Sequence, residues 1–213
     1  EEHELMHLQR SLKTIIDVVA FLSRTESSDA TSEKASFLYP TLHQLTLNIN
    51  VFPHVLKRIG EMLDKFGKIR DNASPTLYNI RTELSKIEGS VSRILNVILR
   101  SIQQEGLIEK DVTPTLRDGR LVIPTPPGVK RKIRGIVHDE SATGKTVFIE
   151  PAEVVEANNR IRELENEERR EIIRLLTEFA NAIRPELNDM KDSYLILAQV
   201  DAIRAKSRLA KQF

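Results

Sequence analysis

The chain has 213 residues, of which 40% are hydrophobic, 30% charged and 5% aromatic, with a net charge of +1 at pH 7. This composition is typical of a folded protein with much exposed helix and one or two domains. The absence of cysteine excludes disulfides, thiolate zinc sites and cysteine nucleophiles. No apolar run reaches the ~18 residues of a membrane span, and the charged start is no signal peptide. We expect a cytoplasmic protein without a membrane partner and, since no Met begins it, part of a longer chain.

The first third of the sequence predicts helices. Apolar residues recur at steps of three and four over residues 4–22, which indicates an amphipathic helix. A polar loop is expected over residues 24–34. Two shorter helices are expected between Tyr39 and Leu63, with Pro40 and Pro53 near their starts. We assign residues 1–73 to the first part of a helical core.

The most regular pattern follows, over residues 74–105. Its apolar residues alternate between steps of three and four, a strict heptad that predicts a coiled-coil seam. They are Leu77, Ile80, Leu84, Ile87, Val91, Ile94 and Ile98. Ser74 is placed to cap this helix, with Pro75 in its first turn. At 1.5 Å per residue the helix is about 45 Å long.

The pattern changes over residues 106–151, where five prolines exclude a continuous helix. Three short runs rich in β-branched residues lie at 120–124, 132–138 and 145–150, separated by turn-forming segments. We predict a small three-stranded antiparallel element that forms a tip.

A second long helix is expected over residues 152–184. The polar run 165–171 interrupts its apolar stripe, so that stretch is predicted to be exposed. Pro185 is expected to end or kink the helix, and residues 185–213 to return to the core. The predicted fold is mainly α: a helical core with two long antiparallel lever helices that carry the three-stranded β insert at their tip.

The segment Gly144-Lys145-Thr146 matches the end of a nucleotide-binding P-loop. A P-loop also requires glycine five residues before Gly144 and a helix after the threonine. Position 139 is instead an aspartate, which repels phosphate, and the residues after Thr146 favour a strand. We interpret the segment as a hairpin turn and expect no ATP site in it.

The segment His3-Glu4-Leu5-Met6-His7 matches the zinc motif H-E-x-x-H. Zinc requires a third ligand, and the longer form of the motif is not continued, because positions 10 and 13 are Arg10 and Lys13. We interpret the two histidines as part of a solvated helix face and expect no metal site and no catalytic residue.

A basic cluster is the remaining candidate site. Residues 117–134 contain six cations and one acid, whereas residues 150–171 contain eight glutamates and four arginines. Positive charge on a projecting tip favours contact with nucleic-acid phosphates, and the absence of interleaved aromatics disfavours base stacking. The alternative is an ordinary solvated strand. The candidate nucleic-acid-binding residues are Arg117, Arg120, Lys130, Arg131, Lys132, Arg134 and Lys145.

Three segments resemble the second bacterial type of MutS protein. They are DNASPTLYNIR, the run from LRDGRLVIP to NRIRELENEE, and DAIRAKSRLA near the end. The resemblance covers essentially the whole chain. One departure is VIPTPPGVKRK, where relatives carry a run such as VIPVKAEYRGK, and a second is Lys145 in place of the family's Ala.

The resemblance implies a core, lever and clamp unit whose clamp grips DNA. It also implies that the ATPase domain, with its ATP and Mg, and a nuclease domain lie outside this sequence, so that the chain itself has no catalytic activity. Relatives are dimeric proteins that bind branched DNA and suppress recombination, and some act on collided ribosomes. Two alternatives stay open: a ribosome-binding tip, and a purely structural coiled-coil or dimerisation element.

Overall fold

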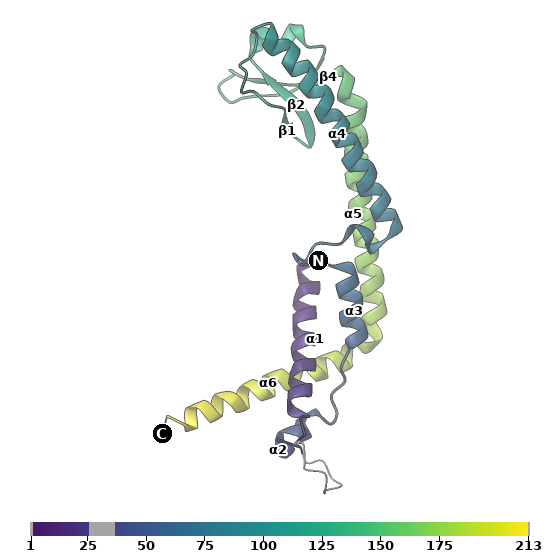
Figure 1. The fold of residues 1–213 in the computed structure, drawn as a ribbon, viewed down its shortest axis with the longest axis vertical. Coiled ribbons are helices and arrows are strands. Elements are labelled where there is room, and N and C mark those ends of the chain that lie inside the picture. The colour runs from purple at the N-terminus through teal and green to yellow at the C-terminus, as the bar shows by residue number, and fades with distance from the viewer. Residues whose placement is uncertain (1, 26–36, 213) are drawn as a thin grey trace. The chain divides into compact units, whose positions relative to one another are not determined.

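The computed structural model describes residues 2–25 and 37–212 (Figure 1). Most of the polar loop expected over residues 24–34 lies outside these ranges. The chain is mainly helical, as predicted, and divides into two compact units, Glu1–Ala73 with Arg174–Phe213 and Ser74–Ile173. We call them the helical unit and the sheet-bearing unit. Within the described ranges, no helix is both long and apolar enough to cross a membrane.

The helical unit is built around α1 (Glu2–Leu22), which contacts both α3 (Pro53–Met62) and α6 (Leu187–Ala210). Its remaining elements are α2 (Pro40–His43), the end of α5 (Val155–Ile183) and short 3₁₀ turns at Gln44–Thr46, Asp71–Ala73 and Arg184–Glu186. Pro185 lies in the turn that separates α5 from α6, which confirms its predicted role as a helix breaker. The buried apolar side chains include Leu12, Ile15, Val55, Ile59, Phe179 and Ile196.

The sheet-bearing unit begins with α4 (Pro75–Gln104), whose predicted cap is confirmed. The Ser74 hydroxyl accepts a hydrogen bond from the Leu77 amide at 3.0 Å, and Pro75 occupies the first turn. The predicted seam is only partly correct. Beyond Val91 the buried stripe moves to Leu95, Leu99 and Ile102, because strand β2 packs against this end of α4.

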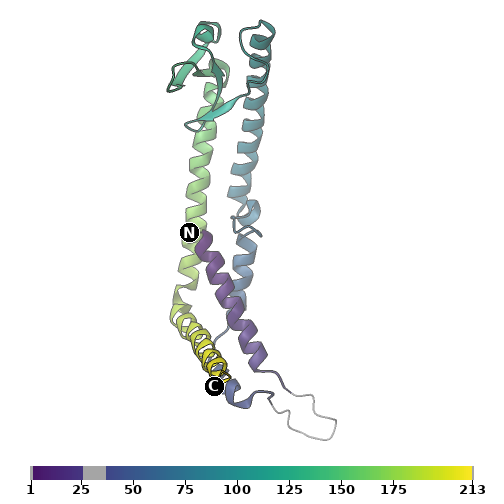
Figure 2. The ribbon, with the colours of Figure 1, turned by 90° about the vertical axis from the view of Figure 1, so that its left-hand side faces the viewer.

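Helices α4 and α5 run antiparallel in this unit (Figure 2). Arg160 Nε donates to Glu83 at 2.9 Å, and Arg81 Nε donates to Glu168 at 2.7 Å. Closer to the start of α4, the Ser74 hydroxyl donates to Glu171 at 2.7 Å. Glu171 is also buried, which corrects the expectation that the whole run 165–171 is exposed. Its burial is tolerated because the carboxylate is hydrogen-bonded.

The sheet has four strands over residues 106–154, all of which are described, rather than the three predicted. The strands are β1 (Thr115–Arg117), β2 (Arg120–Thr125), β3 (Gly135–Glu140) and β4 (Val147–Pro151), in the antiparallel order β1-β2-β4-β3. Strand β1 was not predicted; it has only three residues and pairs with β2 through a hairpin at Asp118-Gly119. Both hairpin residues have positive φ, 47° and 74°, as a type I′ turn requires.

One face of the sheet and both helices share a core. It contains Val91, Leu95, Leu99, Ile102, Ile108, Ile123, Val129, Ile133, Val147, Ile149, Val154 and Ile161. Two of these residues belong to the most basic stretch of the chain: Val129 precedes Lys130, and Ile133 lies between Lys132 and Arg134. This stretch is therefore attached to the same core that joins the sheet to the helices.

Replacing Gly135 with alanine should destabilise the sheet. A Cβ at Gly135 would clash with the backbone carbonyl oxygen of Glu150 and lie 2.9 Å from Pro151 Cα. Both neighbours are backbone atoms and cannot rotate away, so we expect a loss of about 1–3 kcal/mol in the free energy of unfolding, measured by thermal melting followed by circular dichroism. Gly128→Ala is the control, because no atom lies within 4 Å of its Cβ. Equal melting temperatures for the two variants would contradict the prediction.

Candidate nucleic-acid interface

Four of the predicted cations form what we call the basic segment: Lys130, Arg131, Lys132 and Arg134. The first three lie in a 3₁₀ turn, Pro127–Lys132, and Arg134 precedes β3. The expectation of a strand beginning at residue 132 is therefore wrong by three residues. The proline pair at 126–127 favours the turn because it fixes φ and removes two amide donors.

The backbone of the basic segment is held on both sides. Val129 and Ile133 are 6% and 7% exposed, so they anchor the turn in the core. The Val129 amide donates to Pro126 O, and the Ala152 amide donates to Arg134 O, both at 2.9 Å. All four cationic residues are exposed.

In the described part of the chain, no carboxylate forms an ion pair with any of these four charges. Uncompensated cations close together on a fixed backbone produce a local positive potential, although the net charge of the whole chain is only +1. Such a potential attracts polyanions.

Arg117 lies at the end of β1, with its guanidinium carbon 4.1 Å from the centroid of the Phe148 ring. The ring is 6% exposed and braces the exposed arginine by a cation–π contact. This aromatic contact was not predicted, because Phe148 is distant from Arg117 in sequence and reaches it only through the strand order. A ring this buried does not offer a surface for base stacking.

Arg120 differs from the other six cations, because its side chain is only 16% exposed. Its guanidinium donates to Glu150 Oε1 at 2.8 Å and to Asn159 Oδ1 at 2.6 Å. Glu150 is fully buried. Burial by itself raises the pKa of this carboxyl, but hydrogen bonds from Asn158, His138 and Arg120 outweigh it and lower the pKa below its ordinary value.

Lys145 lies in the hairpin between β3 and β4, where the predicted turn is present. Gly144 has φ of 66°, and its amide donates to Ser141 O at 2.7 Å. Strand β4 follows directly, so the segment has no helix N-terminus that could hold a phosphate. Lys145 borders a hollow of about 560 Å³ that is also lined by Leu107 and Pro124.

Lys132 and Arg134 border a different hollow, of about 600 Å³. Its other walls are formed by the last turns of α4, including the exposed Val97, and by two carboxylates, Glu105 and Glu153. The seven candidate cations therefore do not converge on one cavity. They are distributed over a surface, as is typical of contact with a polymer backbone rather than a small molecule.

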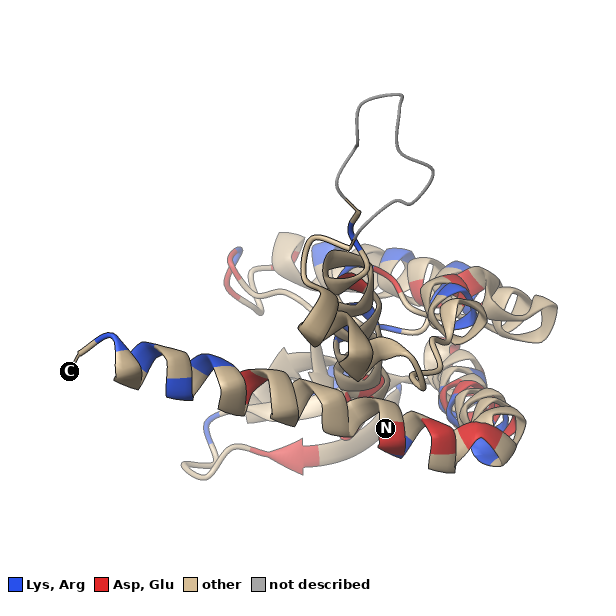
Figure 3. Cartoon of the chain, turned by 90° about the horizontal axis from the view of Figure 1, so that it is seen from below, with Lys and Arg blue, Asp and Glu red and all other residues tan. Residues whose placement is uncertain are grey.

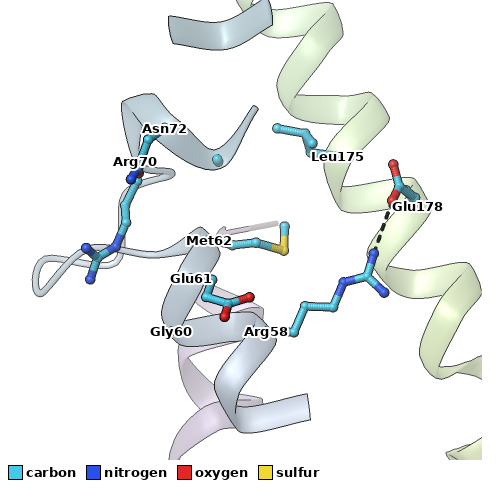
Figure 4. Close-up of a pocket in the computed structure, with 9 residues that line it drawn as sticks. Arg58, Gly60, Glu61, Met62, Arg70, Asn72, Leu175 and Glu178 are labelled. Carbon is cyan, nitrogen blue, oxygen red and sulfur yellow. Dashed lines mark hydrogen bonds and ion pairs between the residues drawn. The ribbon is translucent and has the colours of Figure 1, made fainter. Parts of the chain in front are cut away.

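A hollow of about 550 Å³ in the helical unit contains none of the candidate residues (Figure 4). Arg58 of α3 donates to Glu178 of α5 at 3.1 Å across it, and Met62 and Leu175 form apolar parts of its wall. Two arginines and two glutamates line the hollow, so their charges balance. Such balanced charge does not favour an anionic ligand.

A second basic surface, which was not predicted, lies at the end of α6. Figure 3 shows the Lys and Arg positions along this end of the helix. Arg204, Lys206, Arg208 and Lys211 are all exposed, and no acid lies between them. Arg204, Arg208 and Lys211 share one helix face, since they are spaced by four and three residues. The helical spacing is the signal that could have identified them.

The H-E-x-x-H histidines lie on α1 with ring centroids 6.4 Å apart. Among the residues that the structure describes, no group of three or more His, Cys, Asp or Glu side chains is arranged to hold a metal ion.

The structure defines a mainly helical protein in which an antiparallel helix pair carries a small sheet with an exposed basic turn. No protein-family model matches the chain. Curated proteins named Endonuclease MutS2 do match it. That of Lacticaseibacillus paracasei is 36% identical over 98% of this chain, and that of Thermotoga maritima is 35% identical over 82%. That of Acetivibrio thermocellus is 43% identical over 68%.

The chain therefore belongs to the second bacterial type of MutS protein, as the sequence resemblance indicated. It spans only 25%, 23% and 18% of the length of these three relatives. Their name describes the full-length relatives as endonucleases.

Proposed function

We propose that this chain is the DNA-gripping module of a MutS2-type protein and that it performs no catalysis itself. The observation that carries the proposal is the basic segment: four exposed cations, unpaired within the described chain, on a turn anchored by Val129 and Ile133. Arg117 and Lys145 belong to the same unit, so six exposed cations are available to phosphates.

The contacts would be made to the nucleic-acid backbone rather than to bases. Lysine and arginine bind phosphate without reading sequence, and the one aromatic ring beside these cations is buried. A module that recognises backbone geometry suits branched DNA, such as a recombination intermediate, and its binding would suppress recombination by occupying that intermediate.

In the full-length protein, α4 and α5 would act as levers. The ion pairs between them and the Ser74–Glu171 hydrogen bond connect the two helices within the sheet-bearing unit, so that they would move together. We propose that the full-length protein forms a homodimer and contains an ATPase domain that binds ATP and Mg. The nucleotide state of that domain would change the affinity of the sheet-bearing unit for DNA through these two helices.

A salt titration of binding tests the proposal. Fluorescence anisotropy would measure the affinity of the chain for a four-way DNA junction, a linear duplex of equal length and purified ribosomes from 50 to 300 mM salt. If each of the six cations neutralises one phosphate, log K should fall against log salt with a slope of about −5, and the junction should bind more tightly than the duplex.

Two results would contradict it. Tighter binding to ribosomes than to either DNA would favour the ribosome as the target of the same cations. Tight self-association with no binding to any polyanion would indicate a structural coiled-coil or dimerisation element.

A further inference from the structure

The sheet-bearing unit contains a buried polar network that the proposed DNA contacts do not use. At its centre is the Glu150 carboxylate on β4, which is fully buried. Arg120 Nη1 donates to it at 2.8 Å and Asn158 Nδ2 at 2.7 Å, and His138 Nε2 lies 2.5 Å from it. A buried carboxylate is strongly unfavourable unless it is paired and hydrogen-bonded, so these partners must stay in place.

The network joins three strands to a helix. Arg120, His138 and Glu150 come from β2, β3 and β4, and Asn158 comes from the first turn of α5. His138 is the extra residue of a bulge in β3, because Val137 pairs with Ile149 and Asp139 with Phe148. A bulge redirects one side chain without ending the strand pairing, and here that side chain is the one that meets Glu150.

Asn158 also extends the sheet beyond the last β2–β4 pair. Its Nδ2 donates to Leu121 O at 3.1 Å, and its Oδ1 accepts from the Leu121 amide at 3.4 Å. The side-chain amide thus takes the place of a strand residue beside β2. Since Arg120 also donates to Asn159, two consecutive residues of α5 are bound to two consecutive residues of β2.

The same stretch of β4 supports the basic segment. Arg134, its last cation, accepts a hydrogen bond from Ala152, two residues after Glu150. Gly135 packs directly on the Glu150 backbone. A shift of β4 relative to α5 would therefore move the attachment point of the basic segment.

We infer that Arg120, His138, Glu150 and Asn158 form a polar joint that holds the sheet on α5 and thereby orients the basic segment. Arg120 is in this role a positioning residue and not a phosphate contact. The functional part of the inference rests on the proposed DNA binding, whereas its structural part does not.

Amide hydrogen exchange and DNA binding test the joint in the 213-residue chain. Asn158→Ala keeps the Arg120–Glu150 ion pair and the Arg120–Asn159 hydrogen bond but removes the bonds that Asn158 makes to Leu121 and Glu150. We expect at least threefold faster exchange at Leu121 and Ala152, and about three- to tenfold weaker binding to a four-way junction. Asn159→Ala is the milder second variant should Asn158→Ala fail to fold, and it should show the same changes to a smaller extent.

Salt dependence separates positioning from contact. Arg131→Gln should reduce the magnitude of the salt slope by about 1, because a phosphate contact is lost. Arg120→Gln should weaken binding with the slope unchanged. An equal reduction of the slope in Arg120→Gln would overturn the positioning role.

Unchanged exchange at Ala152 in both asparagine variants would overturn the joint, whatever the DNA result. If these variants bind DNA with wild-type affinity while Arg131→Gln binds more weakly, the orienting role is refuted and the proposed function is left intact. If even Arg131→Gln and reversal of the basic segment leave binding unchanged, the proposed function fails, and the exchange data alone then decide the structural joint.

Discussion

Reversal of the basic segment to glutamate, K130E/R131E/K132E/R134E, should lower the affinity for a four-way junction by about two orders of magnitude or more near 100 mM salt. The four side chains are exposed, so the substitutions leave the core intact. Each reversal removes one phosphate contact and adds repulsion. Equilibrium anisotropy across a salt series measures both the affinity and the remaining slope.

The chain offers a matched control at the end of α6. The variant R204E/K206E/R208E/K211E changes the net charge by the same amount and also alters four exposed cations within eight residues. We expect it to retain most of the affinity. If instead the α6 variant loses binding and the basic-segment variant does not, the nucleic-acid interface belongs to the helical unit.

Replacement of Glu150 with alanine should cost about 3–5 kcal/mol of folding free energy in the sheet-bearing unit. The substitution leaves the largely buried Arg120 guanidinium without its counter-charge and removes an acceptor from Asn158 and His138. Circular dichroism during denaturant unfolding gives the free energy, and amide exchange in β2 and β4 locates the loss. The control is Glu153→Ala, which removes an exposed carboxylate three residues away and should change stability by less than about 0.5 kcal/mol.

The contribution of Glu150 to the free energy of unfolding should decrease as the pH is lowered. Because the pKa of this carboxyl is lowered in the folded state, the folded chain holds the proton less tightly than the unfolded chain. The stability that Glu150 contributes is therefore fully present above its ordinary pKa of about 4.5 and is lost as the pH falls through the lower, folded value. The free-energy difference between wild type and Glu150→Ala should shrink over that range, and a difference that grows on acidification would contradict the assigned direction.

Helix positions and ends were predictable because they depend on short-range rules. The Ser74 cap, Pro75 in the first turn and the break at Pro185 follow from local backbone sterics and hydrogen bonding, and each is present. The exposed basic segment was also evident from sequence, since four cations within five residues cannot be buried without partners.

The residue at which the heptad positions of α4 stop being the buried ones was not predictable. The apolar spacing through Ile94 and Ile98 continues the heptad, yet Leu95 and Leu99 are the residues buried there. The sheet, and not α5 alone, packs on that end of α4. A periodic pattern identifies the apolar face of a helix but does not say which neighbour covers each turn.

Local sequence patterns were sufficient to predict a mainly helical protein whose middle third breaks into short strands and carries an excess of positive charge. Which of these charges are exposed for phosphate contact depends on the tertiary structure. Arg120 and Arg117 look equivalent in sequence, but strand pairing brings Glu150 to the first and the Phe148 ring to the second. Their partners lie about thirty residues away. Such pairings depend on strand order and register, which the pattern of neighbouring residues does not encode.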